Sequence, residues 1–334
     1  MNEHRTILTI DRLVAAFDTE SGRVRAVDGV SLALTAGSIL GLVGESGCGK
    51  SVTALSMMRL LPRPAGVIES GSIRLNGTEL VQLPVEEMQR IRGGRIAMIF
   101  QEPMTALNPV HRIGRQLLEV FEMHRPELEG EDRFAAAVNL MQRVGIPEAR
   151  ERMAAYPHQI SGGMRQRVMI AMALAGKPDV LIADEPTTAL DVTIQAQILD
   201  LILDLQKETG MAVIFITHDL GVIARICEDV AVMYAGQIVE SAPVRTLFKD
   251  PQHPYTRGLL AAMPRLSSAA KQPLPIIRGT VPALDRLPPG CRFQNRCPHV
   301  MDRCKKRLPE PVQVDDAHRA RCFLLEPHDN IDNP

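Results

Sequence analysis

Residues 44–51 read Gly44-Glu45-Ser46-Gly47-Cys48-Gly49-Lys50-Ser51, and this stretch decides the fold. It fits the pattern G-x-x-x-x-G-K-[ST], in which glycines let the backbone wrap closely around a phosphate chain. An apolar run at 39–43 precedes it and predicts a buried strand, while residues 50–61 predict a helix. This order of strand, loop and helix favours a phosphate-binding loop over a glycine-rich turn that happens to end in Lys-Ser.

The loop residues have distinct expected roles. Lys50 would neutralise the β- and γ-phosphates of a nucleotide, and Ser51 would offer its hydroxyl to Mg²⁺. Cys48 is more simply a small loop residue than a redox group. The remaining expected nucleotide contacts of this stretch are Gly44, Ser46, Gly47, Gly49 and Val52.

Outward from the loop, residues 1–250 alternate short β-branched runs with longer helical patterns, which predicts a mainly parallel sheet with crossover helices. Two further apolar strands are expected at 180–183 and 211–217, and between them apolar residues recur at helical spacing until Gly210. Residues 111–155 are polar and helical and predict a separate helical insertion. The segments 7–17 and 71–77 suggest strands of a small antiparallel layer.

Two acidic residues, Asp184 and Glu185, end the strand expected at 180–183. An aspartate at such a position can hold Mg²⁺, and an adjacent glutamate can polarise an attacking water molecule. Paired acids after a strand also cap helices, so the phosphate loop is what tips the interpretation toward catalysis.

A second anion-binding pattern occurs at 160–166. Ser161 is a good helix N-cap, and Gly162 and Gly163 would leave backbone donors accessible at the helix start. Without the other motifs, an ordinary capped helix would be the preferred interpretation of this segment.

Composition narrows the classes of protein. The chain has 334 residues, which at about 150 residues per domain predicts two domains. With 38 Lys and Arg against 39 Asp and Glu, the net charge is −1, which argues against nucleic-acid binding. There is no Trp, with 3 Tyr and 8 Phe, so a surface of stacked rings is not expected.

The sequence predicts neither a membrane-spanning helix nor a signal peptide. The apolar stretch at 168–176 is shorter than the roughly 20 residues of a membrane span. The first twelve residues lack the apolar core of a signal peptide, so the expected location is cytoplasmic.

The last part of the sequence differs in character, because 13 of the 24 prolines lie in residues 251–334 and disfavour long helices there. Four cysteines, Cys291, Cys297, Cys304 and Cys322, have the spacing C-x5-C-x6-C-x17-C. Zinc ribbons favour tighter C-x2–4-C pairs, so four thiolates without a close His pair suit an iron–sulfur cluster better, with zinc as the alternative. Nearby basic residues would favour thiolates; they are Arg292, Arg296, Arg303, Lys305 and Lys306. Cys227 is interpreted as core packing.

Together these motifs resemble the ATPase subunit of an ABC transporter, in family order over about residues 7–250. GESGCGKS resembles Walker A, Gln101 in IFQEP the Q-loop, and ISGGM the signature. VLIADE resembles Walker B, Asp191 the D-loop residue, and His218 in ITHD the switch histidine. Ile160 and Met164 depart from the commonest signature, which has Leu and Gln there.

The resemblance implies an α/β fold: a P-loop ABC ATPase with a RecA-like parallel-sheet core, an antiparallel β layer and a helical insertion. It implies that Lys50, Ser51, Gln101 and Asp184 bind MgATP, with Ser51, Gln101 and Asp184 at Mg²⁺. Glu185 would activate water, and His218 would contact the γ-phosphate. Phe17 would stack on adenine, although a core phenylalanine of the β layer is the alternative.

The resemblance further implies a head-to-tail dimer with two ATP molecules between its modules. Ser161, Gly162, Gly163 and Asp191 would then reach the ATP held by the second module. A single module occurs in this sequence, so the chain alone is expected to be inactive.

The tail segments DPQHPYTRGLLAAMP, GTVPAL, LPPGCRF and NRCP resemble the C-terminal extension of oligopeptide and dipeptide importer ATPases. This implies an ATPase domain at 7–255, with a helical subdomain at about 105–175, and a small irregular Cys-rich C-terminal extension at 256–327. It implies a [4Fe-4S] cluster and peripheral attachment at the cytoplasmic face of the membrane. Its implied partners are a second ATPase subunit in a heterodimer, two transmembrane permeases and, indirectly, an extracytoplasmic peptide-binding protein, without nucleic acid.

Other functions stay open at this stage. The cargo could be a nickel chelate or a glutathione-type peptide, because the ATPase does not touch the substrate. A soluble ABC ATPase acting on DNA or ribosomes is disfavoured by the single module and near-zero charge. A cluster-sensing regulator with a secondary ATPase is disfavoured by the presence of Glu185.

Overall fold

The computed structural model describes residues 5–20, 22–101, 106–187, 191–263 and 275–326. Its chain forms two compact units, each assembled from three separate stretches of sequence. The first unit contains Met1–Thr9, Ala33–Ile39 and Ile73–Ile216, and the second contains Ile10–Leu32, Leu40–Ser72 and Thr217–Pro334.

The first unit contains three parallel strands in which every residue is buried. They are β6 (Ile96–Ile99), β7 (Val180–Asp184) and β8 (Ala212–Thr217). Val180 is paired with Ile96 on one side and with Ala212 on the other. Strands buried on both faces read as continuous apolar runs, which is why 180–183 and 211–217 were recognisable in the sequence.

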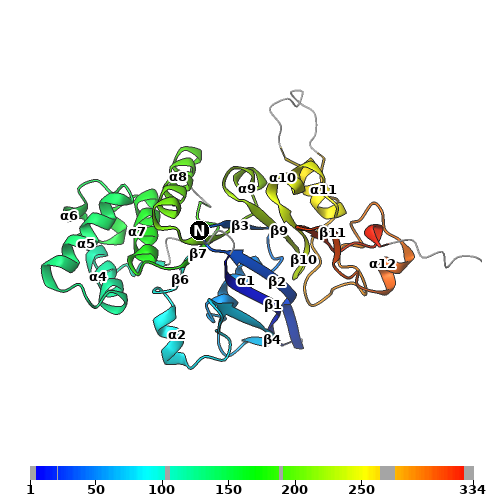
Figure 1. The fold of residues 1–334 in the computed structure, drawn as a ribbon, viewed down its shortest axis with the longest axis horizontal. Coiled ribbons are helices and arrows are strands. Elements are labelled where there is room, and N and C mark those ends of the chain that lie inside the picture. The colour runs from blue at the N-terminus through cyan, green and yellow to red at the C-terminus, as the bar shows by residue number, and fades with distance from the viewer. Residues whose placement is uncertain (1–4, 21, 102–105, 188–190, 264–274, 327–334) are drawn as a thin grey trace, which may run out of the picture. The chain divides into compact units, whose positions relative to one another are not determined.

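Helices connect and flank these strands. The helix predicted between the two strands is α8 (Val192–Thr209), and Gly210 ends it in the left-handed conformation with φ of 69°. The short α2 (Val85–Ile91) precedes β6. Figure 1 shows α4, α5, α6 and α7 gathered together as the predicted helical insertion.

The insertion is an amphipathic bundle. Its members are α4 (Ile113–His124), α5 (Gly130–Arg143), α6 (Ala149–Arg152), the 3-10 turn η1 (Pro157–Gln159) and α7 (Gly162–Ala175). Leu117 and Phe121 of α4 and Met141 of α5 are buried, which places the apolar stripes of both helices in the bundle core.

The second unit contains the strand that leads into the phosphate loop. This strand, β3 (Ile39–Val43), pairs in parallel with β9 (Asp229–Tyr234), with Leu40 opposite Asp229. Antiparallel pairing continues from β9 to β10 (Gln237–Pro243), β12 (His318–Ala320) and β11 (Val312–Asp315). The last two strands belong to the C-terminal extension, so the extension continues the sheet that begins at the phosphate loop.

The helices of the second unit are short. They are α1 (Lys50–Met57), α9 (Leu220–Ile226), α10 (Val244–Lys249), α11 (Pro254–Ala261), α12 (Asp302–Lys306) and the turn η2 (Phe323–Leu325). The predicted helix at 50–61 is therefore too long by four residues, and Arg59, with φ of 50°, lies beyond its end. The expected scarcity of long helices after residue 251 holds for the described part of the tail.

The small β layer is a four-stranded sheet in the order β2-β1-β4-β5. Its strands are β1 (Thr6–Thr19), β2 (Gly22–Thr35), β4 (Gly66–Leu75) and β5 (Thr78–Glu79). The segments 7–17 and 71–77 expected in this layer lie in β1 and at the β4–β5 turn, and β4 and β5 pair antiparallel.

A buried carboxylate ties the extension to the ATPase strands. Glu240 of β10 accepts hydrogen bonds from the backbone N–H groups of Gln252 (2.6 Å) and His253 (2.9 Å). His318 Nε2 of β12 lies 2.8 Å from the same carboxylate, and both side chains are essentially inaccessible to solvent. The pair thus fixes the start of α11 and the strand β12 on one residue.

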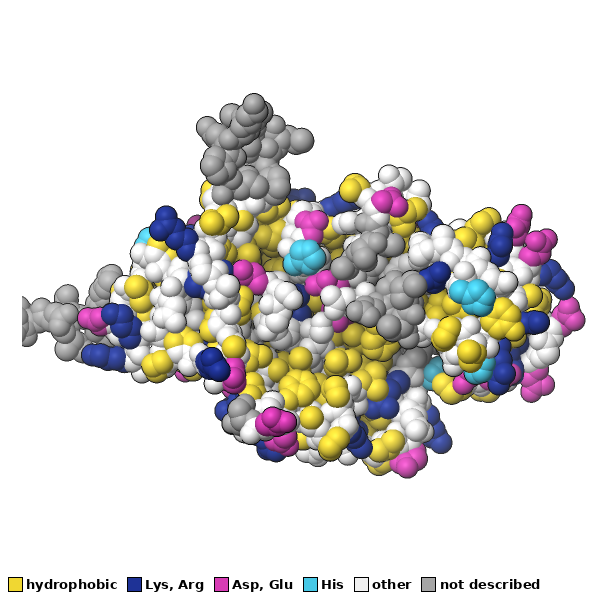
Figure 2. Space-filling model, turned by 180° about the vertical axis from the view of Figure 1, so that it is seen from behind, with side chains coloured by type: hydrophobic (Ala, Val, Ile, Leu, Met, Phe, Trp, Pro, Cys, Tyr) yellow, Lys and Arg dark blue, Asp and Glu magenta, His cyan; other side chains and the backbone are white. Residues whose placement is uncertain are grey.

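The surface carries mixed charge. Figure 2 shows Lys and Arg side chains interspersed with Asp and Glu side chains on the visible face, as the near-zero net charge suggests. Within the described ranges, none of the helices has the length and apolar character needed to cross a bilayer.

Candidate functional site

The phosphate loop has the backbone that its glycines permit. Gly44, Gly47 and Gly49 have φ values of 158°, 77° and 108°, and α1 begins immediately after Gly49. A Cβ atom at Gly44 would lie 2.2 Å from the carbonyl oxygen of Met233, and one at Gly49 would lie 2.5 Å from that of Ala26. Two of the glycines are therefore required both by backbone conformation and by close approach.

Lys50 is folded back onto the loop. Its side-chain Nζ donates to the carbonyl oxygens of Gly44 (2.7 Å) and Glu45 (3.1 Å), and the residue is only 5% exposed. A cation held at the start of a helix, beside backbone N–H groups, forms an electropositive cradle suited to phosphate. Ser51 and Val52 are half-buried in the first turn of α1.

Cys48 is fully buried, and burial raises the pKa of its thiol. Ser46 and Gly47, in contrast, are exposed. They line a cavity of about 450 Å³ together with Thr19 and Val24 of the β layer and residues 281–285 of the extension. A buried, protonated thiol fits the interpretation of Cys48 as a small packing residue.

Phe17, the candidate adenine-stacking residue, is half-buried at the end of β1. A Cβ atom on Gly66 would lie 3.2 Å from Phe17 Cε1, so the ring packs against the backbone of β4. One part of the ring is thereby covered, while the residue keeps part of its surface.

The acidic pair lies at the end of β7, as the sequence predicts. Asp184 is the buried last residue of the strand, and Glu185 follows with a left-handed backbone of φ 47°. Glu185 N–H donates to the carbonyl of Ile216 (2.9 Å), and its Oε2 accepts from Gln101 Nε2 at 3.1 Å. A non-glycine residue in this conformation is uncommon and is typical of functional positions.

The signature segment and the candidate D-loop residue both lie at helix starts within the first unit. Ser161 caps α7 by accepting from Met164 N–H (3.3 Å), and Asp191 caps α8 by accepting from Ile194 N–H (2.9 Å). A Cβ atom on Gly163 would lie 3.2 Å from Ile194 Cγ2, so the two helix starts lie close together. Ser161, Gly162 and Asp191 are all exposed.

The candidate switch residue His218 follows β8 directly and is exposed. The next residue, Asp219, caps α9 by accepting from the backbone N–H groups of Gly221 (2.7 Å) and Val222 (3.3 Å). The cap fixes the chain on one side of His218 and the strand fixes it on the other.

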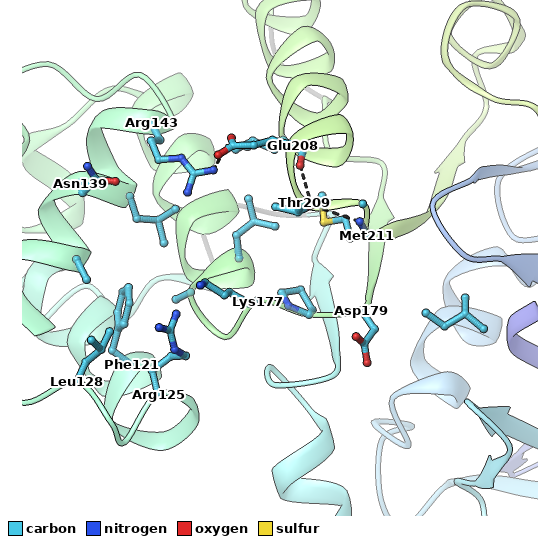
Figure 3. A pocket seen from close by; sticks show the side chains of 18 residues that line it. Phe121, Arg125, Leu128, Asn139, Arg143, Lys177, Asp179, Glu208, Thr209 and Met211 are labelled. Carbon is cyan, nitrogen blue, oxygen red and sulfur yellow. Dashed lines mark hydrogen bonds and ion pairs between the residues drawn. The ribbon is translucent and has the colours of Figure 1, made fainter. Parts of the chain in front are cut away.

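A separate cavity of about 660 Å³ lies in the first unit between the insertion and the ends of β7 and α8 (Figure 3). Its wall includes Phe121 of α4, Arg125 just beyond the end of that helix, and the ion pair of Arg143 with Glu208. Among its described lining residues, none is a residue that the sequence singled out for chemistry.

The four cysteines of the extension are neighbours. The thiol of Cys291 interacts electrostatically with those of Cys304, Cys297 and Cys322. The backbone N–H of His299 donates to Cys297 Sγ and that of Met301 to Cys304 Sγ, both at 3.4 Å. In the described ranges, however, no set of three or more His, Cys, Asp or Glu side chains is arranged to hold a metal ion.

The nearby basic residues, which the sequence suggested would favour thiolates, act on these thiols less strongly than burial does. Burial raises the pKa of Cys291 to about 11 and also raises the pKa of the Cys297 and Cys322 thiols. The guanidinium groups of Arg292 and Arg296 instead bind Asp28 and Glu45. Desolvation therefore outweighs the positive charge that the sequence placed beside the thiols.

Three residues make contacts at the phosphate loop that the sequence did not indicate: Glu45, Tyr255 and Arg296. The carboxylate of Glu45 binds Arg296, and its backbone N–H donates to the hydroxyl of Tyr255 at 2.9 Å. His253 caps α11 by accepting from Tyr255 N–H (3.0 Å). Partners more than 200 residues apart leave no spacing signal in one sequence.

Comparison with known proteins agrees with this geometry. The family model described as "ABC transporter" matches residues 27–188, and the one described as "Oligopeptide/dipeptide transporter, C-terminal region" matches residues 239–304. The oligopeptide transport ATP-binding protein OppD of Bacillus subtilis is 50% identical over 321 residues, covering 96% of this chain and 89% of the relative. The dipeptide transport ATP-binding protein DppD of the same organism is 48% identical over 320 residues, covering 96% and 95%.

A solved structure titled as a dimeric bacterial ABC transporter cassette is also similar. It shares 26% sequence identity with a TM-score of 0.64, covering 71% of this chain and 99% of that one. The P-loop ABC ATPase fold is therefore shown independently of the motifs. On these matches, the chain belongs to the ATP-binding subunits of ABC transporters, in the branch that carries the oligopeptide/dipeptide transporter C-terminal region.

Proposed function

We propose that this ATPase energises the import of oligopeptides or dipeptides across the cytoplasmic membrane. The observation that carries the proposal is the match of residues 239–304 to the oligopeptide/dipeptide transporter C-terminal region. Relatives named for oligopeptide and dipeptide transport support it, because they align with 96% of this chain. A generic ABC ATPase does not need this region, so its presence favours the peptide branch.

ATP would bind at the loop of residues 44–51. Lys50 would leave the carbonyl oxygens of Gly44 and Glu45 for the β- and γ-phosphates, since a phosphate is the stronger partner for its charge. The backbone N–H groups at the start of α1 would donate to the same phosphates. Phe17 would stack on adenine with its exposed part. Further nucleotide contacts are assigned to Ser46, Gly47, Cys48, Gly49, Ser51 and Val52.

Hydrolysis requires a general base and a bound metal ion. Ser51, Gln101 and Asp184 offer the hydroxyl, amide and carboxylate oxygens that Mg²⁺ prefers, and the ion would offset the phosphate charge. Glu185 would accept a proton from the attacking water, and Gln101 is already within hydrogen-bond distance of its carboxylate. His218 would donate to the γ-phosphate.

The second half of each ATP site would come from another ATPase subunit. Ser161, Gly162, Gly163 and Asp191 lie close together at two helix starts, and the residue after Asp191, Val192, is an apolar side chain that is 83% exposed. Capped helix N-termini attract phosphate, and an exposed apolar residue beside them suits an interface. A heterodimer with a related subunit is the proposed assembly.

The subunit would lie peripherally at the cytoplasmic face, bound to two transmembrane permeases that receive peptide from an extracytoplasmic binding protein. A groove of about 670 Å³ in the helical insertion is a candidate docking site for a permease segment. Its walls carry both charge signs, from Arg112, Arg115, Glu119 and Glu122, beside the ring of Phe134. Such a mixed lining suits a short amphipathic helix.

The four extension cysteines are proposed to hold a [4Fe-4S] cluster, with Zn²⁺ as the alternative. Four neighbouring thiols, two of which accept backbone N–H groups, have the donor chemistry that such a cluster needs. Ligand thiols release their protons when they bind a metal, and in their present arrangement these side chains would also have to converge. A cluster there would supply a structural cross-link between the four segments.

The catalytic assignment is tested with Glu185→Gln. In the assembled transporter this variant should retain ATP after purification and abolish peptide uptake, because the base is lost and the nucleotide site is kept. Glu208→Gln is the matched control, since Glu208 is a helix glutamate paired with Arg143 away from the loop. Uptake at the wild-type rate by Glu185→Gln would contradict the assigned role.

Two further measurements test partners and metal. Affinity purification from detergent-extracted membranes should recover two permeases and a second ATPase; recovery of ribosomal or DNA-repair proteins without a membrane protein would refute the importer. After anaerobic purification, iron, sulfide and broad visible absorbance should be lost in Cys304→Ser and kept in Cys227→Ala. Zinc without iron would refute the cluster.

A further inference from the structure

One residue of the phosphate loop, Glu45, is held at its side chain by Arg296 of the C-terminal extension and at its backbone by Tyr255 of α11. Its two carboxylate oxygens accept from the two terminal nitrogens of Arg296, at 2.6 and 3.0 Å. Its backbone N–H donates to the Tyr255 hydroxyl at 2.9 Å. These partners lie 251 and 210 residues further along the chain. No other contact described above joins the extension so directly to the nucleotide-binding backbone.

The arginine that makes this contact is itself immobilised. Its side chain is 4% exposed, and its guanidinium lies over the rings of Tyr234 (5.8 Å) and Phe293 (5.9 Å). Its Nε donates to the carbonyl of Arg278 at 3.0 Å. These contacts together hold the planar guanidinium in a single orientation. A lysine could not reproduce them, because its ammonium group is neither planar nor able to pair with two oxygens in parallel.

The contact reaches the group that meets phosphate. The carbonyl oxygens of Gly44 and Glu45 are those on which Lys50 rests, so the position of the Gly44–Glu45 peptide sets the position of Lys50 Nζ. A loop that is held in its binding conformation before ATP arrives loses less conformational entropy on binding.

We propose that Arg296 is a positioning residue for ATP: through Glu45 it holds the phosphate loop, and with it Lys50, in the conformation that binds the nucleotide. The inference rests on the proposed ATP site and adds a residue of the extension to it. Arg296 precedes Cys297, so the same segment carries a thiol of the cysteine group and the anchor of the loop.

The test is ATP binding by calorimetry on the full-length chain, with KM and kcat for ATP in the assembled transporter. Arg296→Ala and Glu45→Ala should each weaken ATP binding and raise KM about tenfold, the factor expected for one charge-assisted pair. The kcat should change less than about twofold, because neither residue touches the reacting atoms. The double variant should be no weaker than either single one.

Arg307→Ala is the matched control. Arg307 also lies over a ring, that of Phe323 at 5.0 Å, and also pairs with a glutamate, Glu326 at 3.1 Å, but it does not contact the loop. Its ATP affinity should equal that of the wild type. If Arg296→Ala does not fold, Glu45→Gln and Arg296→Lys keep the side-chain size and should still weaken binding.

Three outcomes would overturn the proposal: unchanged affinity in the folded Arg296 and Glu45 variants, additive effects in the double variant, or an equal loss in Arg307→Ala. The variants could show the predicted ATP affinities while the wild-type transporter neither hydrolyses ATP nor transports peptide. That result would refute the proposed function but would support the positioning role of Arg296. A wild-type chain that binds no ATP would refute both.

Discussion

The phosphate loop at 44–51 and the C-terminal extension belong to the same compact unit but keep their shapes by different means. The loop depends on neighbours in sequence: three glycines with positive φ and a lysine that binds carbonyls five and six residues away. The extension has few regular elements, and side chains distant in sequence hold it. Glu240 pairs with His318, and Asp28 pairs with Arg292.

The difference teaches which parts of a sequence carry local instructions. A glycine with positive φ acts where it stands, so a motif of eight residues can be recognised without a structure. An ion pair across 251 residues depends on the complete fold, and neither partner shows its role in the sequence. Residues of the first kind shape the nucleotide site itself, while pairs of the second kind hold the extension and, for Arg296 and Glu45, join it to the loop.

The strongest test of this contrast removes the buried carboxylate of Glu240. Glu240→Ala should lower the free energy of unfolding by about 3–5 kcal/mol, because three donors lose a buried acceptor. Urea denaturation of the full chain measures it. Glu310→Ala, an exposed glutamate of the same extension, should cost less than about 0.5 kcal/mol. A loss below about 1 kcal/mol for Glu240→Ala would mean that other contacts hold the extension.

The loop should respond in the opposite way to loss of its lysine. Lys50→Ala should reduce ATP hydrolysis on the order of 10²–10³-fold, because a preorganised donor to the phosphates is lost. Its free energy of unfolding should change by about 1 kcal/mol or less, since Lys50 contacts only backbone carbonyls and a thiol. Phosphate release by the assembled transporter and urea unfolding give the two numbers. Substantial remaining hydrolysis would mean that a residue other than Lys50 makes the phosphate contact.

Two glycines of the loop separate backbone strain from steric clash. Gly47→Ala should cost about 1–2 kcal/mol, because φ is positive but a Cβ atom meets nothing within 4 Å. Gly49→Ala should cost about 2–4 kcal/mol, because the added Cβ would also lie 2.5 Å from the Ala26 carbonyl. Thermal or urea unfolding compares the two. Equal losses would show that the loop relaxes around residue 49.

A pH experiment tests the start of α11, which Glu240 also holds. Burial lowers the pKa of His253 to about 3, so the folded state keeps this histidine neutral while the unfolded state, near 6.5, takes up a proton. Stability from this group is therefore present above about pH 6.5 and is lost as pH falls, by about 2 kcal/mol at pH 5. His253→Asn keeps an acceptor for the helix cap and cannot titrate. Its unfolding free energy should fall less steeply between pH 7 and 5; an identical slope would contradict the assignment.

Much of the fold could be predicted, for reasons that particular residues make plain. The strands at 39–43 and 180–183 are apolar throughout because both faces are buried, and Gly210 marks the end of α8 through its left-handed backbone. The end of α1 was not predictable, because the chain turns at Arg59 with an ordinary residue in an unusual conformation. The pairing of β10 with β12, from 240 to 320, carries no local signal.

The candidate site divides in the same way. The sequence predicted that Gln101, Glu185 and the loop glycines matter, and the hydrogen bond of Gln101 to Glu185 joins two of them across 84 residues. It placed Arg292 and Arg296 beside the thiols by sequence proximity, whereas their guanidinium groups point to carboxylates elsewhere. Side-chain direction and burial both depend on the tertiary fold, and burial raises the pKa of the Cys291, Cys297 and Cys322 thiols.

The separation of Glu45 from Tyr255 and Arg296 has a consequence in time. A ribosome adds about 5–20 residues per second, so the loop is made roughly 10–50 s before the arginine that anchors it. During that interval the nascent chain has the phosphate loop without the Arg296 contact, and the sheet without β11 and β12. Chains that terminate before residue 296 would share this state permanently. Because Arg296 is synthesised so late, its contact with Glu45 is present in a full-length subunit and missing from a chain that ends before residue 296.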